Sequence, residues 1–527
     1  MPGTITSDLV DISTAESVTG WTGTGGGGGS GGALAINDDN KIQGTYCISY
    51  RVSNATGTVY FQTGAGVNLT GQHVFLWWKS ITAASLDTKA NTGMGVKLGS
   101  NVATDTDYKI WKIFGSDNYK DGGWRIVAVD PTSTADTTLG TYSNTAARRF
   151  GTTDKFISAV TGANTFHDVI RYGTGLTITA GTSGAPVTFA DILATDNSNT
   201  NQWGILREVS GILYGNGKMK FGDGTTSTYF KDTNKVLVYE NYPVAANFYE
   251  IQVLANATFV LGNLSGSLAS GGCIIKSSGT KEWTLTSSAG TSLIYASTLN
   301  NMRSGSLSNT SVIRNSVINS CGNIVTNGAS LVNTTVSNTT AATTSAAITV
   351  KSTTEMAAIN NCSFTGNSRA IRIELTGATG QTFNFTLDNL NFSGNTFDFQ
   401  ISAPNNSIIN LNVTNGGNAS TYEIVSGTGI TVNINNSVTL TLTGIVTGSE
   451  VRIYDQTSPT PNELTGIEST TGSTFQYTYN YIAGTLVDIV VHKEDYIYYR
   501  IENYELGSSS ASLPIAQIFD RNYEDPV

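Results

Sequence analysis

The sequence predicts an all-β protein of several domains, and three observations predict it. Gly, Ser, Thr and Asn fill the polar positions, and these residues form helices poorly. Short runs of β-branched and aromatic residues alternate with turn residues along the whole chain. A motif at Asn361 recurs at Asn389, 28 residues later. Because 527 residues exceed what one hydrophobic core usually holds, more than one domain is expected.

Residues 1–235 are predicted to form a jelly-roll sandwich of the concanavalin-like, lectin-like kind. Six of the seven tryptophans fall in this range, and runs such as HVFLWWKSI and WRIVAVD are separated by Gly, Asn and Asp turns. That spacing is typical of a β-sandwich. The tract Gly25–Gly29 is interpreted as a loop, because no Lys-Ser/Thr pair follows it as in a phosphate-binding loop.

Residues 246–436 are predicted to form a parallel β-helix. The repeat aligns INNCSFTGN at 359–367 with LDNLNFSGN at 387–395, so Phe364 is expected to stack under Phe392. A weaker form of the repeat, Asn followed three residues later by an apolar residue, begins at Asn315, Asn333 and Asn410. Asn suits such coils because its amide pairs from coil to coil and because it tolerates left-handed corners.

Residues 437–506 are predicted to form a small sandwich of immunoglobulin or transthyretin type. In this range apolar and polar residues alternate again, and tyrosines are frequent. Residues 507–527 lack a strand period and are interpreted as a C-terminal docking arm. An arm rich in Gly and Ser buries little surface by itself, so a neighbouring subunit is expected to order it. The candidate docking residues are Pro514, Ile515, Phe519 and Tyr523.

Charge and residue spacing argue against several classes of ligand. The formal net charge of -10 disfavours nucleic acid and anionic lipid, and no apolar run is long enough to insert into a membrane. Four cysteines without paired spacing, at 47, 273, 321 and 362, are expected to be buried small hydrophobes. The histidines at 73, 167 and 492 stand apart, and the cluster at 38–40 makes no cation cage. No metal and no cofactor are predicted.

The order of the three predicted domains resembles that of tail spikes, head fibres and capsid decoration proteins of tailed bacteriophages. The segments that carry the likeness are FGDGTTSTYFKDTNKVLVYE, VDIVVHKEDYIYYRIENYEL and SLPIAQIFDRNYEDP. The resemblance implies a surface-exposed structural protein of the virion, in contact with other phage proteins. It also implies a homotrimer. No catalytic motif accompanies it.

The candidates for binding a host-cell glycan are Trp77, Trp78, Trp111, Trp124 and Asp121, with Asp107 and Asn118 close in the sequence. Sugars pack on aromatic faces and hydrogen-bond to amides and carboxylates. Adjacent Trp77 and Trp78 must point to opposite faces of a strand, so one fills the core while the other faces outward. The competing interpretation packs both tryptophans between layers.

No catalytic residue is predicted, and the chain is expected not to be an enzyme. Glycosidases need two facing carboxylates, and between 251 and 440 only Asp388 with Asp398 or Glu355 with Glu374 offer such a pair. A polysaccharide depolymerase is the first alternative function. A bacterial surface adhesin is the second. Residues 1–20 lack the features of a secretory signal, which favours the exterior of a virion released by lysis over ordinary secretion.

Overall fold

The computed structural model confirms that the protein is almost entirely β. It describes residues 4–24, 34–52, 56–157, 164–198, 201–279, 283–340, 344–435, 437–456, 462–480, 484–507 and 510–521. The glycine tract at 25–29 and Tyr523 lie outside this set. Two α-helices occur among the described residues, α1 (Phe189–Asp196) and α2 (Thr353–Ala357).

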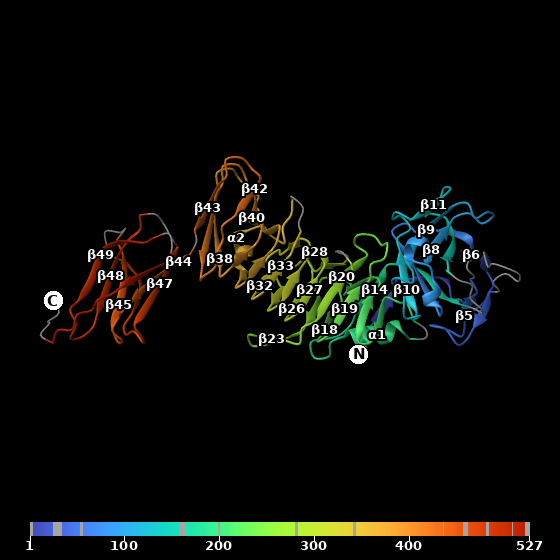
Figure 1. Cartoon of the computed structure of the whole chain (residues 1–527), viewed down its shortest axis with the longest axis horizontal. Helices are drawn as coiled ribbons and strands as arrows, with labels where there is room; N and C mark the ends of the chain where they lie inside the picture. Colours follow the sequence, from blue (N-terminus) through green and yellow to red (C-terminus); the bar gives the residue numbers. More distant parts are fainter. Residues whose placement is uncertain are drawn as a thin grey trace. The chain divides into compact units, whose positions relative to one another are not determined.

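The chain divides into two compact units. The first comprises Met1–Ser311 with Ser320–Gly322, and the second comprises Val312–Asn319 with Asn323–Val527. Figure 1 colours the chain along its sequence.

The first unit begins with two antiparallel sheets that face each other across one core. One sheet has the order β10 (Arg125–Val129), β7 (His73–Ser80), β13 (Thr165–Gly173), β5 (Cys47–Tyr50) and β4 (Ala35–Asn37), with β2 (Val10–Ser13) also paired to β13. The other has the order β11 (Thr137–Leu139), β9 (Tyr108–Phe114), β8 (Met94–Gly99), β12 (Ala147–Asp154), β6 (Gly57–Val67) and β3 (Trp21–Thr24). Both sheets contribute large aromatic side chains, including Tyr50, Trp78, Trp111 and Phe150, to their shared core.

The rest of the first unit coils through three sheets of mainly parallel strands (Figure 1). One contains β14 (Gly175–Thr179), β17 (Lys218–Phe221), β20 (Tyr249–Val253), β25 (Trp283–Thr286) and β28 (Met302–Ser306), with β1 (Thr4–Ser7) antiparallel to β14. The second contains β16 (Ile212–Gly215), β19 (Val236–Tyr239), β24 (Ile274–Ser277) and β27 (Thr298–Asn300), with β15 (Leu206–Val209) antiparallel to β16. The third contains β18 (Thr228–Asp232), β21 (Ala257–Leu261) and β26 (Thr291–Tyr295), and β22 (Asn263–Ser265) pairs with β23 (Leu268–Ser270) in a separate hairpin.

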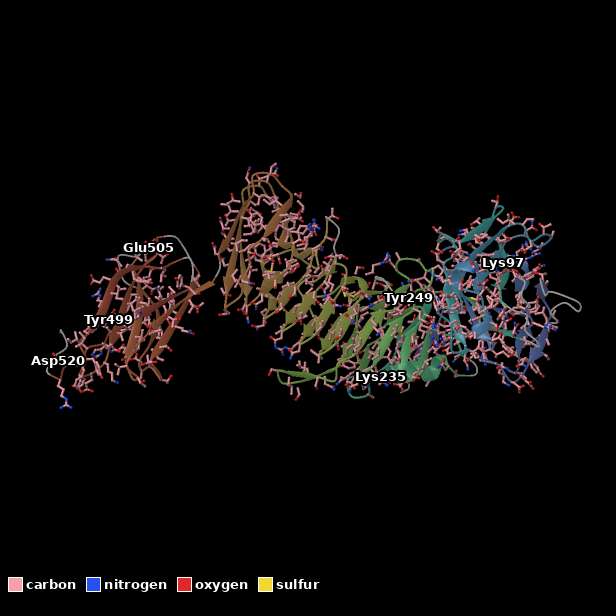
Figure 2. All side chains as sticks on the ribbon, viewed as in Figure 1. Lys97, Lys235, Tyr249, Tyr499, Glu505 and Asp520 are labelled. Carbon is pink, nitrogen blue, oxygen red and sulfur yellow. The ribbon has the colours of Figure 1, made fainter. Side chains whose placement is uncertain are left out.

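The coil starts earlier than the sequence pattern suggested. Parallel pairing begins between β14 and β17, inside the range 1–235 that was assigned to the sandwich. The reason is that the first coils are filled by aromatic side chains and lack the Asn-rich texture of the later ones. Phe221, Phe230 and Phe259 pack with ring centroids 4.9 Å apart in each pair. Tyr249, marked in Figure 2, lies 5.2 Å from Tyr239 by the same measure.

The second unit contains three sheets of short, parallel strands. One sheet contains β31 (Ile324–Val325), β34 (Ile348–Val350), β37 (Arg369–Glu374), β40 (Phe397–Ser402) and β42 (Tyr422–Ser426). Another contains β30 (Val317–Asn319), β33 (Thr335–Ser337), β36 (Ser363–Thr365) and β39 (Asn391–Ser393). The third contains β29 (Val312–Arg314), β32 (Ser330–Val332), β35 (Ile359–Asn360), β38 (Thr382–Asp388), β41 (Ile408–Thr414) and β43 (Thr431–Asn435).

The predicted stacking of Phe364 and Phe392 is confirmed. The two residues are register partners on β36 and β39, and their ring centroids lie 5.2 Å apart. Val336 on β33 is the register partner of Phe364, and Ile318 on β30 is the partner of Val336. One inward position therefore forms a continuous buried column across four strands.

The asparagines act at corners and in ladders, as predicted. Asn315, Asn333, Asn361 and Asn389 all have positive φ. The Asn389 amide donates to Asn361 Oδ1 at 2.8 Å, and the Asn333 amide donates to Asn315 Oδ1 at 3.2 Å. Asn410 does not lie at a corner, because it is within β41 and the corresponding corner is Asn415. It does form a ladder, since its amide donates to Asn384 Oδ1 at 2.7 Å.

The C-terminal domain has two sheets around its own core. One has the order β47 (Thr474–Asn480), β44 (Ser437–Thr443) and β50 (Ala511–Pro514), and the other β46 (Asn462–Ile467), β45 (Glu450–Asp455), β48 (Leu486–His492) and β49 (Tyr499–Glu505). Figure 2 marks Tyr499 and Glu505 at the two ends of β49.

The presumed docking arm lies largely within this domain. Pro514 ends β50, which pairs with β44, and Ile515 is buried in the domain core. Phe519 contacts Tyr496 with ring centroids 5.3 Å apart, yet it remains 53% exposed. Of the described docking candidates, Pro514 and Phe519 are exposed, whereas Ile515 stabilises its own domain.

The four cysteines are free and buried, as expected. Among the described residues, no helix combines the length and apolar character that crossing a membrane requires.

The buried column makes a stability prediction. Phe364→Ala should lower the free energy of unfolding by about 3–5 kcal/mol, because it removes a fully buried ring and leaves a cavity between coils. Phe364→Leu should cost clearly less. Urea unfolding followed by circular dichroism measures the effect, with Phe519→Ala as a matched change of an exposed ring. Equal stability of the Phe364→Ala and Phe519→Ala variants would contradict the column.

Candidate functional site

Strand β7 presents one face to each of two cores in the first unit. Val74, Leu76 and Trp78 point into the sandwich. His73, Phe75 and Trp77 alternate with them and pack against Gly204, Ala245 and Phe248 of the coil; we call this contact the seam. The rings of Phe75 and Phe248 lie 5.6 Å apart between centroids. The prediction that Trp77 and Trp78 point to opposite faces is confirmed, but the expectation that one of them faces outward is wrong. Both are packed between layers, as in the competing interpretation.

A cavity of about 410 Å³ opens where Trp77 meets the coil, and we call it the seam pocket. Its wall from the sandwich comes from the end of β7, the turn before β10 and the segment that precedes β5. Its wall from the coil comes from the end of α1 and from β15. The lining residues are Lys41, Ile42, Trp77, Asp121, Gly123, Trp124, Arg125, Asn197, Gln202, Arg207, Glu208 and Val209.

Three of the five predicted glycan-binding residues meet in this pocket. Trp77 lies at its buried side, Trp124 is half-buried, and Asp121 is exposed. The other two do not contribute. Trp78 and Trp111 are buried in the sandwich core, where no sugar can reach their rings.

The two neighbouring polar residues of the sequence analysis serve loop structure instead. Asp107 accepts hydrogen bonds from the Thr141 backbone at 2.9 Å and the Asn101 amide at 3.1 Å. Asn118 accepts from the Gly115 backbone at 2.8 Å. Neither residue lines the seam pocket.

The charged side chains from the coil are the part that sequence reasoning missed. Arg207 is 8% exposed, donates to Glu240 at 3.2 Å, and lies over the ring of Tyr214. Glu208 follows it on β15 and is exposed. Their positions along the chain, more than eighty residues after Trp124, carried no signal, because they reach the pocket only through the folding of the coil onto the sandwich.

Asp121 and Arg125 form an ion pair at the mouth of the pocket, with 2.7 Å between Oδ2 and Nη2. Burial raises the pKa of Asp121, but the hydrogen bond and positive charge of Arg125 outweigh it and hold the pKa below its ordinary value. Asp121 is therefore ionised at neutral pH. It offers a carboxylate that accepts hydrogen bonds.

Buried ionisable groups hold both walls of the pocket. Asp168 on β13 accepts from the backbone of Ile42 at 2.7 Å and of Gln43 at 3.1 Å. Arg171, on the same strand, donates to the Gln202 carbonyl and to the Gln43 side chain. Asp196 at the end of α1 accepts from the backbone of Gly204 at 2.9 Å and of Leu206 at 2.5 Å. These contacts fix the loop segments around Ile42 and Gln202 and the start of β15 at the pocket wall.

Gly204 closes the coil wall against Trp77. Its φ is +78°, and a Cβ atom built there would lie 2.0 Å from Ile126 Cδ1 and 3.0 Å from Trp77 Cζ2. Any larger residue would therefore push against Trp77. A glycine is required at this point by both backbone conformation and space.

The predicted carboxylate pairs of the coil do not assemble into a site. Asp388 accepts from the Asn415 amide, whereas Asp398, on a strand of a different sheet, accepts from the backbone of Ser420 and Thr421. Glu355 lies in the first turn of α2, and its carboxylate accepts from the Lys351 backbone. Glu374 pairs with Arg372 on β37. Each carboxylate is held by a different set of partners.

The three histidines lie in separate places. His73 lies at the seam, His167 is buried beside Thr152, and His492 ends β48. Across the part of the chain that the structure describes, no group of three His, Cys, Asp or Glu side chains is arranged to hold a metal ion.

The chain matches no protein-family model and no curated protein. Solved structures with a weak likeness include a family 11 carbohydrate-binding module from Clostridium thermocellum in complex with a mixed-linked tetrasaccharide, at 13% identity over 33% of this chain and 96% of that one, with a TM-score of 0.23. A carbohydrate esterase from the Shiga toxin-encoding bacteriophage phi24B matches at 15% identity over 32% of this chain and 98% of that one, with a TM-score of 0.19. A GH87 α-1,3-glucanase from Streptomyces thermodiastaticus matches at 10% identity over 82% of this chain and 96% of that one, with a TM-score of 0.19.

One expectation of the sequence analysis is corrected by these neighbours. The chain was expected not to be an enzyme, yet enzymes that act on carbohydrates are among the structures it resembles, and that expectation is withdrawn. The sequence offered no catalytic motif, which is why it pointed the other way. At these TM-scores the likeness assigns no activity to the chain.

The pocket wall makes a prediction about pH. Burial raises the pKa of Asp196 from 3.8 to about 7, against the opposing hydrogen bonds from Leu206 and Gly204. The unfolded carboxyl releases its proton at lower pH than the folded one, so the stability that Asp196 contributes is full below about pH 4 and is lost as pH rises through 7.

Asp196→Asn removes this titration. The free energy of unfolding of the wild type relative to the variant should therefore increase as pH falls from about 7 to about 4, by at most about 4 kcal/mol. Urea unfolding of both proteins across this range measures the difference. If the difference in free energy of unfolding between the two proteins stays constant, or becomes smaller at low pH, Asp196 does not titrate in this way.

Proposed function

We propose that this protein binds cell-surface glycans and that the seam pocket is the binding site. The observation that supports the proposal is the convergence of Trp124 and Trp77 with Asp121, Arg125 and Glu208 around one cavity of about 410 Å³. Aromatic faces bind the C–H faces of sugar rings, and charged and amide groups bind the hydroxyls. The cavity volume is within the range of sites that hold small ligands.

Two polar atoms of the wall strengthen the case. Trp77 Nε1 and Arg207 Nε are buried and have no hydrogen-bond partner among the described residues. Buried donors are normally paired, because leaving one unpaired costs about 1–3 kcal/mol. Sugar hydroxyls and the waters that accompany them are acceptors of the kind these donors need.

We further propose the finer assignments that the sequence suggested. The antiparallel sandwich is of jelly-roll, lectin-like type, the coil is a parallel β-helix, and the C-terminal domain is of immunoglobulin or transthyretin type. The protein then belongs to the exterior of a tailed-phage particle as a homotrimer, with the exposed Phe519 as a subunit contact. Peptide mass spectrometry of purified particles and the mass in solution test these two statements, and absence from particles or a stable monomer contradicts them.

Cleavage of the bound glycan is a second candidate function, and one observation favours it. Asp121 and Glu208 reach the same pocket from the sandwich and from the coil. Glycosidases use two carboxylates that flank the scissile bond, one as acid and one as base or nucleophile. The ion pair with Arg125 keeps Asp121 ionised, which suits the base or nucleophile role and leaves the acid role to Glu208.

Trp124→Ala tests glycan binding. The variant should bind oligosaccharides at least about tenfold more weakly than the wild type, because it removes the accessible aromatic surface of the pocket. Glycan-array screening identifies a ligand, and isothermal titration measures its affinity for both proteins. Phe519→Ala removes an exposed ring outside the pocket and should leave the affinity unchanged. An affinity unaffected by Trp124→Ala would contradict the assignment of the site.

Asp121→Asn and Glu208→Gln test cleavage. If the pocket hydrolyses its glycan, each variant should lose at least about a hundredfold in rate while still binding the oligosaccharide. Reducing-end release from the polysaccharide ligand measures the rate, and Glu374→Gln is a control carboxylate on the coil. Cleavage that persists in both pocket variants would place the chemistry elsewhere, and a wild type that binds without cleaving would leave binding as the function.

A further inference from the structure

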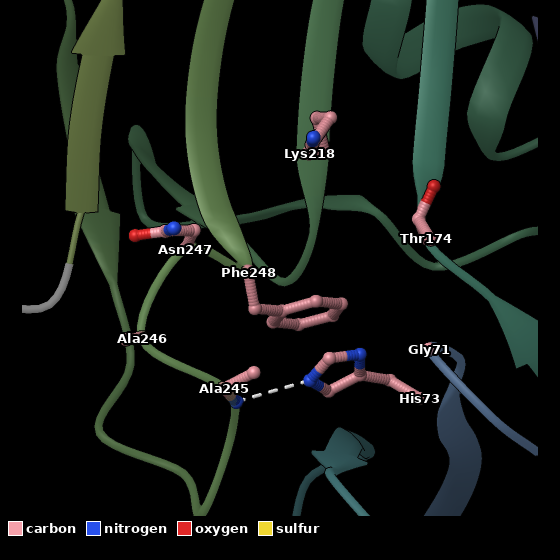
Figure 3. Close-up of a pocket in the computed structure, with 8 residues that line it drawn as sticks. All are labelled: Gly71, His73, Thr174, Lys218, Ala245, Ala246, Asn247 and Phe248. Carbon is pink, nitrogen blue, oxygen red and sulfur yellow. Dashed lines mark hydrogen bonds between the residues drawn. The ribbon is translucent and has the colours of Figure 1, made fainter.

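A second cleft lies at the other end of the seam, beside His73 (Figure 3). It has a volume of about 340 Å³, and its lining includes Thr174, Lys218, Asn247 and Phe248. A neighbouring cavity of about 320 Å³ shares Thr174 and Lys218 and adds Lys220. The two cavities adjoin at Thr174 and Lys218, and we call them together the lysine cleft.

The hydrogen bond to Ala245 fixes which nitrogen of His73 carries the proton. The backbone N–H of Ala245 donates to Nε2 at 3.0 Å, so Nε2 holds the lone pair and the neutral ring carries its proton on Nδ1. Burial lowers the pKa of His73 to about 4 although Asp130 acts in the opposite direction, so the ring is neutral at physiological pH. His73 presents an N–H at Nδ1.

This N–H lacks an acceptor. His73 is only 6% exposed, and its Nδ1 has no hydrogen-bond partner among the described residues. The ring cannot easily turn away, because it stacks on Phe248 with 3.8 Å between centroids. In Figure 3 the ring lies beneath Phe248 on the side of the cleft formed by Thr174 and Gly71. A buried donor held in this way calls for an acceptor from a ligand.

The remaining polar groups of the cleft also favour an acceptor. Lys218 and Lys220 alternate on β17 and so lie on the same face of the strand. Lys218 forms an ion pair with Glu250, with 2.6 Å between Nζ and Oε2. Asp8, the acidic residue of the lining, already accepts from the backbone of Thr174 and Gly175 at 2.9 Å each. Both of these donors bind Oδ1, and the Thr174 hydroxyl donates to Oδ2 of the same carboxylate. Glu250 offsets the charge of Lys218, whereas Lys220 has no ion-pair partner among the described residues and adds a positive charge to the lining.

We propose that the lysine cleft binds the carboxylate of an acidic sugar, with His73 Nδ1–H as its hydrogen-bond donor and Lys218 and Lys220 as its positive charges. This inference rests on the proposed function, and it names the class of glycan: one that carries hexuronic or nonulosonic acid. His73 and Trp77 are four residues apart on β7, which is about 13 Å, so one oligosaccharide of a few sugars can approach both ends of the seam.

Two variants of the full chain test the inference. His73→Phe keeps a ring against Phe248 but removes the Nδ1 donor together with the acceptor for the Ala245 N–H, and Lys220→Met removes one charge. Each should weaken binding of a carboxylate-bearing oligosaccharide by about tenfold or more, since hydrogen bonds to charged groups are strong. After chemical reduction of its carboxyl groups, the same oligosaccharide should bind to each variant with the same affinity as to the wild type. Lys235→Met, a lysine of the coil outside the cleft, is the matched control.

The probes are a glucuronate-containing and an N-acetylneuraminate-containing oligosaccharide, each with its carboxyl-reduced form, measured by isothermal titration. Preference of the wild type for one acidic probe over its reduced form, lost in both variants, supports the cleft and identifies the acid. Equal affinity for the acidic and reduced forms, with Trp124→Ala weakening both, overturns the cleft but leaves the proposed function intact. Absence of any binding by the wild type contradicts both. Circular dichroism confirms that the variants are folded.

Discussion

The alternation of side chains along β7 is the constraint on which the candidate sites depend. Successive side chains of a strand point to opposite faces, so when one face fills a core the alternate residues lie on the other face. In β7 both faces are buried. Val74, Leu76 and Trp78 complete the sandwich, while His73, Phe75 and Trp77 form the seam with the coil. The seam pocket lies at one end of this contact and the lysine cleft at the other. Both therefore exist only when the two parts of the first unit are joined.

Buried charges give this apolar contact a defined geometry. Asp168 and Arg171 lie on the face of β13 that pairs with Trp77 and Phe75. They bind backbone and side-chain groups of Gln43 and its neighbours, and Arg171 also binds the carbonyl of Gln202. Burial makes a carboxyl group costly to ionise, and it raises the pKa of Asp168 to about 6 against the opposing hydrogen bonds from the backbone of Ile42, Val169 and Gln43. Such groups position segments for a site more exactly than apolar packing does.

The sequence predicted what depends on local period and missed what depends on long-range folding. Period two placed Trp77 and Trp78 on opposite faces, and the repeat placed Phe364 on Phe392. The start of the coil was missed, because Phe221 and its aromatic neighbours fill the first coils with side chains typical of a sandwich. Burial within the sandwich separates Trp111 from Trp124, and no pattern in the sequence distinguishes the two. Arg207 and Glu208 carried no signal because their neighbours in the pocket are distant in the chain.

The most direct test of this account is a crystal structure of the full chain with a bound oligosaccharide identified by glycan-array screening. A sugar ring is expected against Trp124, within hydrogen-bond distance of Asp121, Arg125 or Glu208. A ligand bound only to the outer surface of the coil or to the C-terminal domain, with the seam pocket empty, would contradict it.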